Sequence, residues 1–294
     1  YGPAGWAGTQ MIGSTGSDHV HGMTIDSDNN LYLTGHSYGD MGGQTGSGSI
    51  DITLLKYNSG GERQLVKYYT ATGGSPDGYG TDIAVDSSGN LYLTGHTDGS
   101  DLYGASVGGS LKHYLVKVTA NGEVDWSKIL GTCVMNEHQR VAVDSSNYVS
   151  GVYVETGIVR FSAAGVSQGS DSTLITGPDS ADSAPGIAVD STGNLYVGYW
   201  DSSISSRYVI KYNTSVVEQA SESVAGAWPG DIAVDSSGNV IVAGDVSSIP
   251  FSGETCTNSG GGELYVQKYA ASDLTTPSWT RLLCTTGDDE ATDV

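Results

Sequence analysis

Two histidines, His36 and His96, follow the same five residues, Leu-Tyr-Leu-Thr-Gly, and therefore occupy equivalent positions in two copies of one motif. Neutral imidazole is a common metal ligand, and it can act as a general base near neutral pH. In later copies the equivalent positions hold Trp200 and Asp245. Duplication of a structural sequence explains the shared pair more simply, so we treat His36 and His96 as candidates on a ligand-binding face.

Carboxylates are the second group that could do chemistry, because Ca²⁺ takes six to eight oxygen ligands. An aspartate in a turn commonly caps its own backbone instead, and the glutamate that closes an EF-hand loop is missing. We therefore expect no cofactor, with calcium as the alternative. The candidate metal ligands are Asp26 and Asp28 in one turn, Asp98 and Asp101 in a later loop, and Asp288 and Asp289 near the end of the sequence.

The three cysteines match no metal-binding spacing. Cys256 lies in a predicted loop and Cys284 ends a predicted outer strand of the same repeat, so a disulfide between them is expected. Cys133 is then left over, and its role stays open between a buried thiol and a bond to another chain.

Aromatic residues and one sequon complete the candidates. Trp200 and Trp228 stand near predicted loops and are the candidates for a sugar-binding surface. Asn213-Thr-Ser215 is a candidate N-glycosylation site. No Gly-x-Ser-x-Gly elbow occurs and no helix is evident, so the sequence offers no catalytic constellation.

The composition excludes several partner classes. The chain of 294 residues has 33 acidic and 12 basic residues, for a formal net charge of −21. Such a surface repels phosphate backbones and anionic lipids, so we expect no nucleic-acid binding. No apolar run reaches the roughly 18 residues of a spanning helix, so we expect no membrane insertion. Few lysines, many Gly, Ser and Thr residues, and the sequon favour an extracellular or cell-surface protein.

One motif organises the chain and must position all of these residues. Asp86-Ser-Ser-Gly-Asn-Leu-Tyr-Leu-Thr-Gly95 predicts a strand end, a tight turn and a second strand. Its aspartate recurs at positions 26, 144, 190 and 235, with separations of 60, 58, 46 and 45 residues along the chain. Repeats of this length, each with room for several strands, are typical of a propeller.

Each repeat predicts four strands, named a to d in chain order. Strand a is Ile-Ala-Val-Asp or similar, and strand b follows the turn. Strand c carries a basic residue at one position in all five repeats, for which we expect a structural ion pair or a carbonyl contact. The predicted d strand of the third repeat is Thr173–Thr176. The long Gly/Ser-rich b–c loops lie at one end of the strands, where a binding site is most readily built.

We therefore predict an all-β fold, a single propeller of about five four-stranded blades over residues 1–294. The alternative is a slice of a six- to eight-bladed or longer array. Residues 1–17 predict an extra outer strand that no blade requires. The predicted repeat units are approximately 18–80, 81–138, 139–184, 185–229 and 230–294.

The segments Asp82–Gly95 and Asp231–Gly244 resemble the SBBP beta-propeller repeat and, more distantly, NHL-type repeats. The resemblance is clear in repeats one, two and five, and weakest in repeat three. It implies a propeller fold in a secreted or surface protein, and it carries no catalytic motif.

The leading functional hypothesis is a non-enzymatic structural module that acts by protein–protein contacts and self-assembles through the extra strand. The second is a carbohydrate- or ligand-binding propeller that uses the long-loop face, with calcium. The third is a propeller lyase or lactonase with a metal in a central channel. The small apolar residues of strand a argue against the third.

Overall fold

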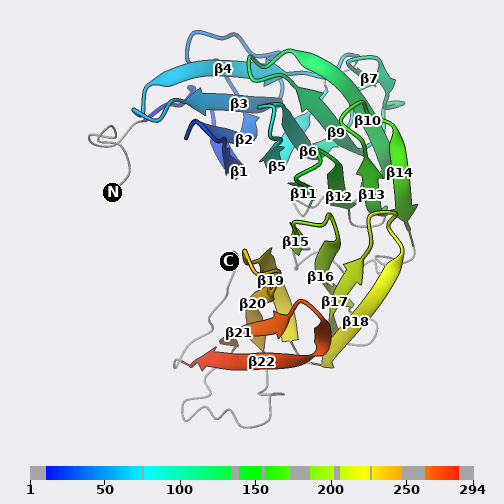
Figure 1. Cartoon of the computed structure of the whole chain (residues 1–294). Coiled ribbons are helices and arrows are strands. Elements are labelled where there is room, and N and C mark those ends of the chain that lie inside the picture. Colours follow the sequence, from blue (N-terminus) through cyan, green and yellow to red (C-terminus); the bar gives the residue numbers. More distant parts are fainter. Residues whose placement is uncertain are drawn as a thin grey trace. The chain divides into compact units, whose positions relative to one another are not determined.

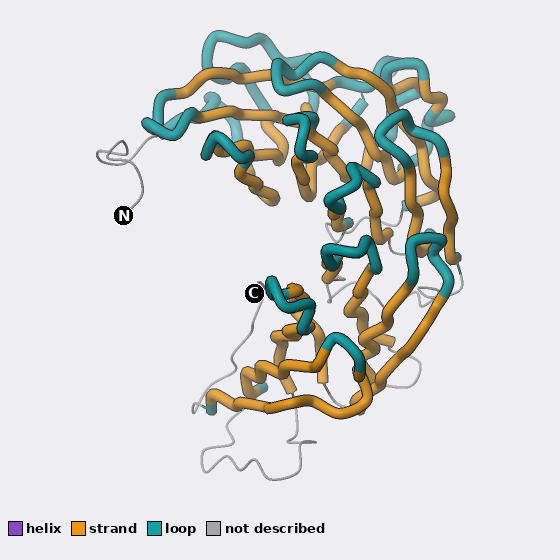
Figure 2. Tube along the Cα trace, viewed as in Figure 1, coloured by secondary structure: helices purple, strands orange, loops and turns teal. Residues whose placement is uncertain are grey.

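The computed structural model describes residues 11–73, 76–133, 139–153, 156–172, 186–201, 206–225, 227–246 and 262–284. Every regular element in these ranges is a β-strand (Figure 2). The predicted all-β fold is therefore confirmed, and the described ranges contain no helix long and apolar enough to cross a bilayer. The chain forms two compact units, Tyr1–Val143 and Asp144–Val294, and the division falls inside the third repeat.

The first unit contains two four-stranded antiparallel sheets, which we call blades one and two (Figure 1). A two-stranded hairpin, β7 (Asp101–Leu102) with β8 (Ala105–Ser106), lies in the b–c loop of blade two, and β11 (Arg140–Val143) ends the unit. Blade one consists of β1 (Asp18–Ile25), β2 (Leu31–Ser37), β3 (Asp51–Tyr57) and β4 (Arg63–Tyr69). Blade two consists of β5 (Gly78–Val85), β6 (Leu91–Thr97), β9 (Lys112–Val118) and β10 (Val124–Thr132).

The second unit begins with three strands of blade three, β12 (Val149–Tyr153), β13 (Gly157–Phe161) and β14 (Ser167–Asp171). Two complete four-stranded sheets follow. Blade four consists of β15 (Gly186–Val189), β16 (Leu195–Asp201), β17 (Ser206–Tyr212) and β18 (Glu218–Ala225). Blade five consists of β19 (Ala227–Val234), β20 (Val240–Val246), β21 (Glu263–Ala270) and β22 (Asp273–Leu283).

Two of the predicted strands differ from the strands that the structure describes. The outer strand described in blade three is β14, Ser167–Asp171, and the predicted d strand Thr173–Thr176 lies outside the described ranges. The prediction followed apolar residues, whereas the register with β13 selects the polar segment that directly follows the short turn. Residues 11–17 of the predicted extra strand form no strand, because the Ser14 backbone N–H donates to the Asp18 carboxylate (2.6 Å) and bends the chain.

The repeated aspartate holds the a–b turn together in the same way in each blade. In blade two, Asp86 Oδ1 accepts hydrogen bonds from the backbone N–H groups of Ser88 and Asn90, both at 2.9 Å. Its other oxygen accepts from the Asn90 amide and the Tyr92 hydroxyl. Gly89 has φ of 80°, a left-handed conformation that glycine adopts at no steric cost. The motif is thus a self-contained turn built around one carboxylate.

Within each unit, the core lies between successive blades. Ile83, Leu91 and Leu93 form what we call the front face of blade two, and they are buried in one cluster with residues of blade one. The same front positions of blade five are buried against blade four. In the cluster shared with blade two, blade one contributes Tyr32, Ile52 and Leu54, which form what we call its back face.

Candidate functional site

A row of aromatic rings runs across blades one and two at the ends of their b strands, next to the long loops. The His36 ring lies 4.6 Å from the Tyr79 ring, and Tyr79 lies 4.6 Å from the His96 ring (centroid to centroid). His96 is paired in register with both Tyr79 and His113. The two histidines selected from the sequence are therefore brought into one row, with Tyr79 between them.

Two further histidines, which the sequence analysis did not select, join this row at blade one. His19 pairs directly with His36 across β1 and β2, and their rings stack at 4.7 Å. His21 stands at a β-bulge in β1, with its ring 5.1 Å from His36. One ligand atom from each of the three lies within 4.8 Å of the others. The alternation His19-Val-His21 was a sequence signal for two rings on one side of a strand.

The local backbone explains why His19 comes so close to His36. Gly35 precedes His36, and a Cβ atom there would lie 1.8 Å from the His19 carbonyl oxygen. Only glycine permits this approach of β1 to β2. Gly95 fulfils the same role in blade two, where a Cβ would lie 1.8 Å from the Tyr79 carbonyl oxygen. The recurring Thr-Gly-His sequence is therefore a packing signature that also places a ring at the strand end.

The electrostatics keep His36 neutral at physiological pH. Burial, together with the nearby His21, His19 and His96, lowers the pKa of His36 to about 4, and Asp18 opposes the shift. The side chain is only 4% exposed, and its Nδ1 atom has no hydrogen-bond partner. Asp18 lies beside the cluster and accepts a hydrogen bond from the Ser37 hydroxyl (2.6 Å). A neutral imidazole with an unused nitrogen is suited to bind a metal or to accept a proton.

The acidic candidates are not gathered into a calcium site within the described ranges. Asp26 receives hydrogen bonds from its own turn and from Tyr32. Asp98 accepts from the Asp77 backbone N–H, and Asp101 from the Gly104 backbone N–H. Asp28 is exposed in the first turn, and Asp288 and Asp289 lie outside the described ranges. Asp26, Asp98 and Asp101 thus accept hydrogen bonds from backbone N–H groups, and a role for any of the six carboxylates in binding calcium stays a prediction.

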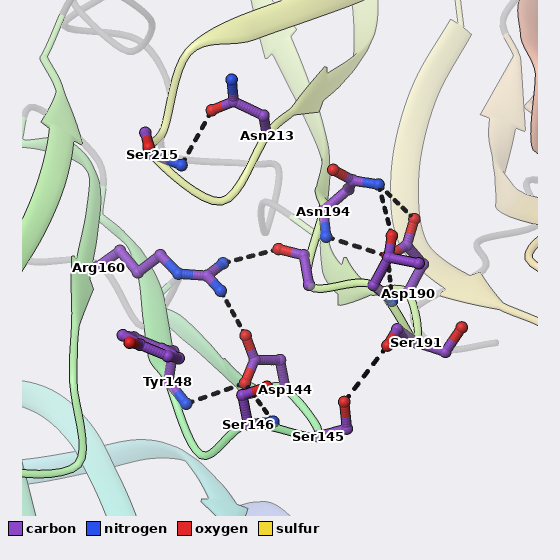
Figure 3. A network of polar contacts seen from close by, with 12 residues as sticks. Asp144, Ser145, Ser146, Tyr148, Arg160, Asp190, Ser191, Asn194, Asn213 and Ser215 are labelled. Atoms are coloured by element: carbon purple, nitrogen blue, oxygen red, sulfur yellow. Dashed lines mark hydrogen bonds and ion pairs between the residues drawn. The ribbon is translucent and has the colours of Figure 1, made fainter.

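The remaining candidates are separate from the ring row. Trp228 is half-buried in β19, and its carbonyl oxygen accepts the Tyr265 hydroxyl at 3.3 Å. Trp200 lies in β16, and the arrangement of its side chain is outside what the structure describes. Asn213 caps the turn after β17 by accepting from the Ser215 backbone N–H (2.9 Å), as Figure 3 shows. Glycosylation of Asn213 stays a prediction.

Two cysteines fall within the described ranges. Cys133 is buried, and Cys284 is disulfide-bonded. Cys256, its predicted partner, lies outside the described ranges, so the Cys256–Cys284 pairing stays a prediction.

The basic residue of strand c is structural, as expected. In blade five Lys268 forms an ion pair with Asp235 at 2.7 Å, and in blade four Lys211 donates to the Ala271 carbonyl. In blade three Arg160 binds the Asp144 carboxylate and the Gly193 carbonyl (Figure 3). Tyr148 stands where the other turns have asparagine, and Arg160 supplies the missing donor. Repeat three is therefore degenerate in sequence but keeps the same turn.

A second buried polar cluster connects blades four and five within the second unit. Arg207 is fully buried, lies over the Tyr265 ring and donates to the Tyr269 hydroxyl at 2.9 Å. It also donates to the Gln267 side chain and forms an ion pair with Glu222 at 3.4 Å. Burial raises the pKa of Glu222 although Arg207 opposes the shift. A buried charge with these partners favours a structural role, in which it specifies how the strands pack, over a catalytic role.

A cavity of about 290 Å³ lies at the opposite strand ends of blades four and five. It is lined by Asn194 and Lys211 of blade four and by Asp273 and Leu274 of blade five, among others. Because it opens beside the short turns, it does not belong to the long-loop face on which a ligand site was expected.

Four-stranded antiparallel sheets with a shared turn motif define a beta-propeller protein. Residues 8–40 and 66–103 match the family model of the SBBP beta-propeller repeat. The second match runs from the d strand of blade one through strands a and b of blade two. No curated protein sequence matches the chain.

Solved structures support the fold alone, because their sequence identities are low. The chain is similar to a protein of unknown function from Bacteroides caccae, with a TM-score of 0.51, 10% identity, and coverage of 90% of this chain and 82% of that one. It is also similar to the NanB sialidase from Streptococcus pneumoniae, with a TM-score of 0.54 and 10% identity. That match covers 91% of this chain and 61% of the sialidase chain.

Proposed function

We propose that this chain is a non-enzymatic, extracellular propeller module that assembles with further copies of itself by blade-to-blade contact. The main support for this proposal is that the front face of blade one is exposed. Val20, Met23 and Ile25 of β1 are 58%, 67% and 60% exposed. Leu31 and Leu33 of β2, on the same face, are only half-buried. Exposed apolar patches of this kind mark interaction surfaces.

The occupant of this face is inferred from how the chain packs its own blades. Front faces in the interior of each unit are covered by the back face of the preceding blade. A matching back face is incompletely covered on blade five, where Ile241, Leu264 and Val266 are half-buried. Their counterparts in blade one, Tyr32, Ile52 and Leu54, are buried. We therefore propose that blade five of one copy packs on blade one of the next.

Such a contact is head-to-tail, so it generates rings or filaments and not a simple two-fold dimer. It differs from the assembly mode expected from the sequence, in which an extra strand in residues 1–17 pairs edge to edge; residues 11–17 form no strand, and residues 1–10 lie outside the described ranges. The extracellular assignment is supported by the disulfide at Cys284, since disulfides persist in oxidising compartments.

The test is the oligomeric state of the full chain, measured by sedimentation over a range of concentrations. We expect concentration-dependent oligomers for the unmodified chain, and monomers for Met23→Asp and for Val266→Asp. A one-to-one mixture of the two variants retains one intact pair of faces and should form a heterodimer. Val166→Asp and Val217→Asp are matched controls, because these residues are 60% and 54% exposed at turns away from both faces.

A monomeric unmodified chain in which Met23 is protected from oxidation would overturn the proposal, because the face would then be covered from within its own chain. Oligomers that persist equally in both aspartate variants would also overturn it. Circular dichroism of each variant shows whether the blades remain folded.

A second candidate function, carbohydrate binding, is favoured by exposed aromatic rings in the long loops. Tyr38 and Tyr103 are 47% and 46% exposed in the b–c loops of blades one and two. Sugars stack on such rings, and neither residue was selected from the sequence. A glycan array should show signal that Tyr38→Ala and Tyr103→Ala remove and that a calcium chelator leaves unchanged. An array without signal would exclude this function.

A further inference from the structure

We propose that His19, His21 and His36 form a binding site for a divalent transition-metal ion, with Zn²⁺ as the first candidate. The three side chains come from adjacent positions of β1 and β2, and their ligand atoms lie within 4.8 Å of one another. Imidazole nitrogen is a preferred donor for zinc, copper and nickel, whereas calcium and magnesium prefer oxygen. The donor set therefore selects the class of ion.

The arrangement combines one fixed ligand with two adjustable ones. His36 is 4% exposed and is held between β1 and Tyr79, and its buried Nδ1 atom has no hydrogen-bond partner. His19 and His21 are exposed at the surface beside it. Nitrogens around a tetrahedral zinc lie about 3.4 Å apart, given Zn–N bonds of about 2.0–2.1 Å. Closing the site therefore needs a modest rotation of the two surface rings.

Scaffold packing alone does not account for the histidines in β1. Blade two has the same register and the same bulge, and it carries Tyr79 and Thr81 at the positions of His19 and His21. Since the fold accepts tyrosine and threonine there, the strand geometry does not require histidine. Three imidazoles converge only at blade one among the described residues, where the edge strand also leaves the cluster open to solvent.

The surrounding charges favour a cation. Asp18 lies beside the cluster, hydrogen-bonded to Ser37 and to the Ser14 backbone, and its carboxylate provides a nearby negative charge. Three protein ligands leave a fourth position for water or for a side chain of a partner. The proposal is independent of the assembly proposed above, because Met23 and Ile25 belong to the front face of β1, whereas His19 pairs with His36 on the opposite face.

The test measures zinc affinity of the full chain, produced without a histidine tag and stripped with a chelator, by competition with a zinc-sensitive dye. The main variant is His19→Tyr with His21→Thr, which introduces the residues that blade two carries and which should therefore fold. We expect one zinc per unmodified chain and an affinity loss in the variant greater than the roughly 100-fold that losing a supporting residue costs. Co²⁺ bound to the unmodified chain should give the visible absorption of a tetrahedral site.

Met23→Asp is the control, and it should keep the zinc affinity even if it abolishes assembly. Unchanged zinc binding in the double variant would overturn the proposal, since the ion would then be held elsewhere. Absence of zinc binding by the unmodified chain would overturn it as well. Circular dichroism and the thermal unfolding midpoint without metal show whether the double variant is folded, and His36→Gln provides a second variant that removes the buried ligand.

Discussion

Blades one and two have nearly the same strands, turn and register, yet equivalent residues meet opposite surroundings. Met23 in β1 pairs with Leu33, and Ile83 in β5 pairs with Leu93 at the same point of the motif. Met23 is 67% exposed and Ile83 is 3% exposed. The front face of blade two is covered by blade one, whereas the β1 part of the front face of blade one is exposed and only Leu31 and Leu33 behind it pack in a small cluster with Ile12 and Met41. Equivalent positions of the motif are therefore surface in blade one and core in blade two.

The comparison also separates scaffold from site. Gly35 and Gly95 bring the first two strands of each blade equally close together. Only blade one uses that closeness to stack His19 and His21 on His36, because blade two carries Tyr79 and Thr81 instead. A motif that is common to both blades is structural, and the departures from it carry the candidate chemistry.

The largest expected difference between the blades concerns these equivalent apolar positions. Ile83→Ala should lower the free energy of unfolding by about 2–5 kcal/mol, because it leaves a cavity between blades. Met23→Ala should change it by less than about 0.5 kcal/mol, because the side chain is exposed. Urea unfolding at concentrations where the chain is monomeric measures both. Equal losses would show that the front face of blade one is covered.

A smaller difference is expected at the turn aspartates. Asp86→Ala should cost about 1–3 kcal/mol, because it leaves the backbone N–H groups of Ser88 and Asn90 and the Tyr92 hydroxyl without their acceptor. Asp26→Ala removes the same bonds from a turn that is more exposed to water, and it should cost less. The ratio of the two losses, again from urea unfolding, tests whether burial sets the cost. A larger loss for Asp26→Ala would contradict this explanation.

The smallest expected effect is the pH dependence at the first turn. Burial alone would raise the pKa of Asp26, but hydrogen bonds from Asn30, Tyr32 and Asp28 outweigh it and lower the pKa below 3.8. The ionised carboxylate thus stabilises the fold above pH 3.8, and this contribution is lost as the pH falls through the lower value of the folded state. Acid unfolding of Asp26→Asn should lose that part of the dependence. A profile identical to that of the unmodified chain would contradict the assignment.

The sequence predicted the fold well because the propeller turn is local. Asp86, Gly89 and Asn90 complete their hydrogen bonds within five residues, so the motif indicates its own structure. In the third repeat the prediction followed apolar content alone and so missed β14, which is the polar segment Ser167–Asp171. Strand identity there depends on the register with β13 and not on propensity.

The candidate site was predicted only in part. His36 and His96 were found because they repeat, whereas His19 and His21 were missed because they do not. Their contribution depends on the pairing of β1 with β2, which no single segment encodes. The sequence does not show which backbone groups the carboxylates meet, and Asp26, Asp98 and Asp101 each accept a hydrogen bond from nearby backbone.

The sequence by itself determined the repeat, the four-stranded blade and the turn chemistry, because each depends on contacts between residues close along the chain. Tertiary structure alone decided which copies of the motif are buried and which imidazoles meet. Burial of Ile83 and exposure of Met23 follow from the presence or absence of a neighbouring blade, and the contact of His19 with His36 follows from strand register. Equivalent positions of a repeated motif cannot encode such a difference in burial, because the free energy of burial depends on what packs against a face.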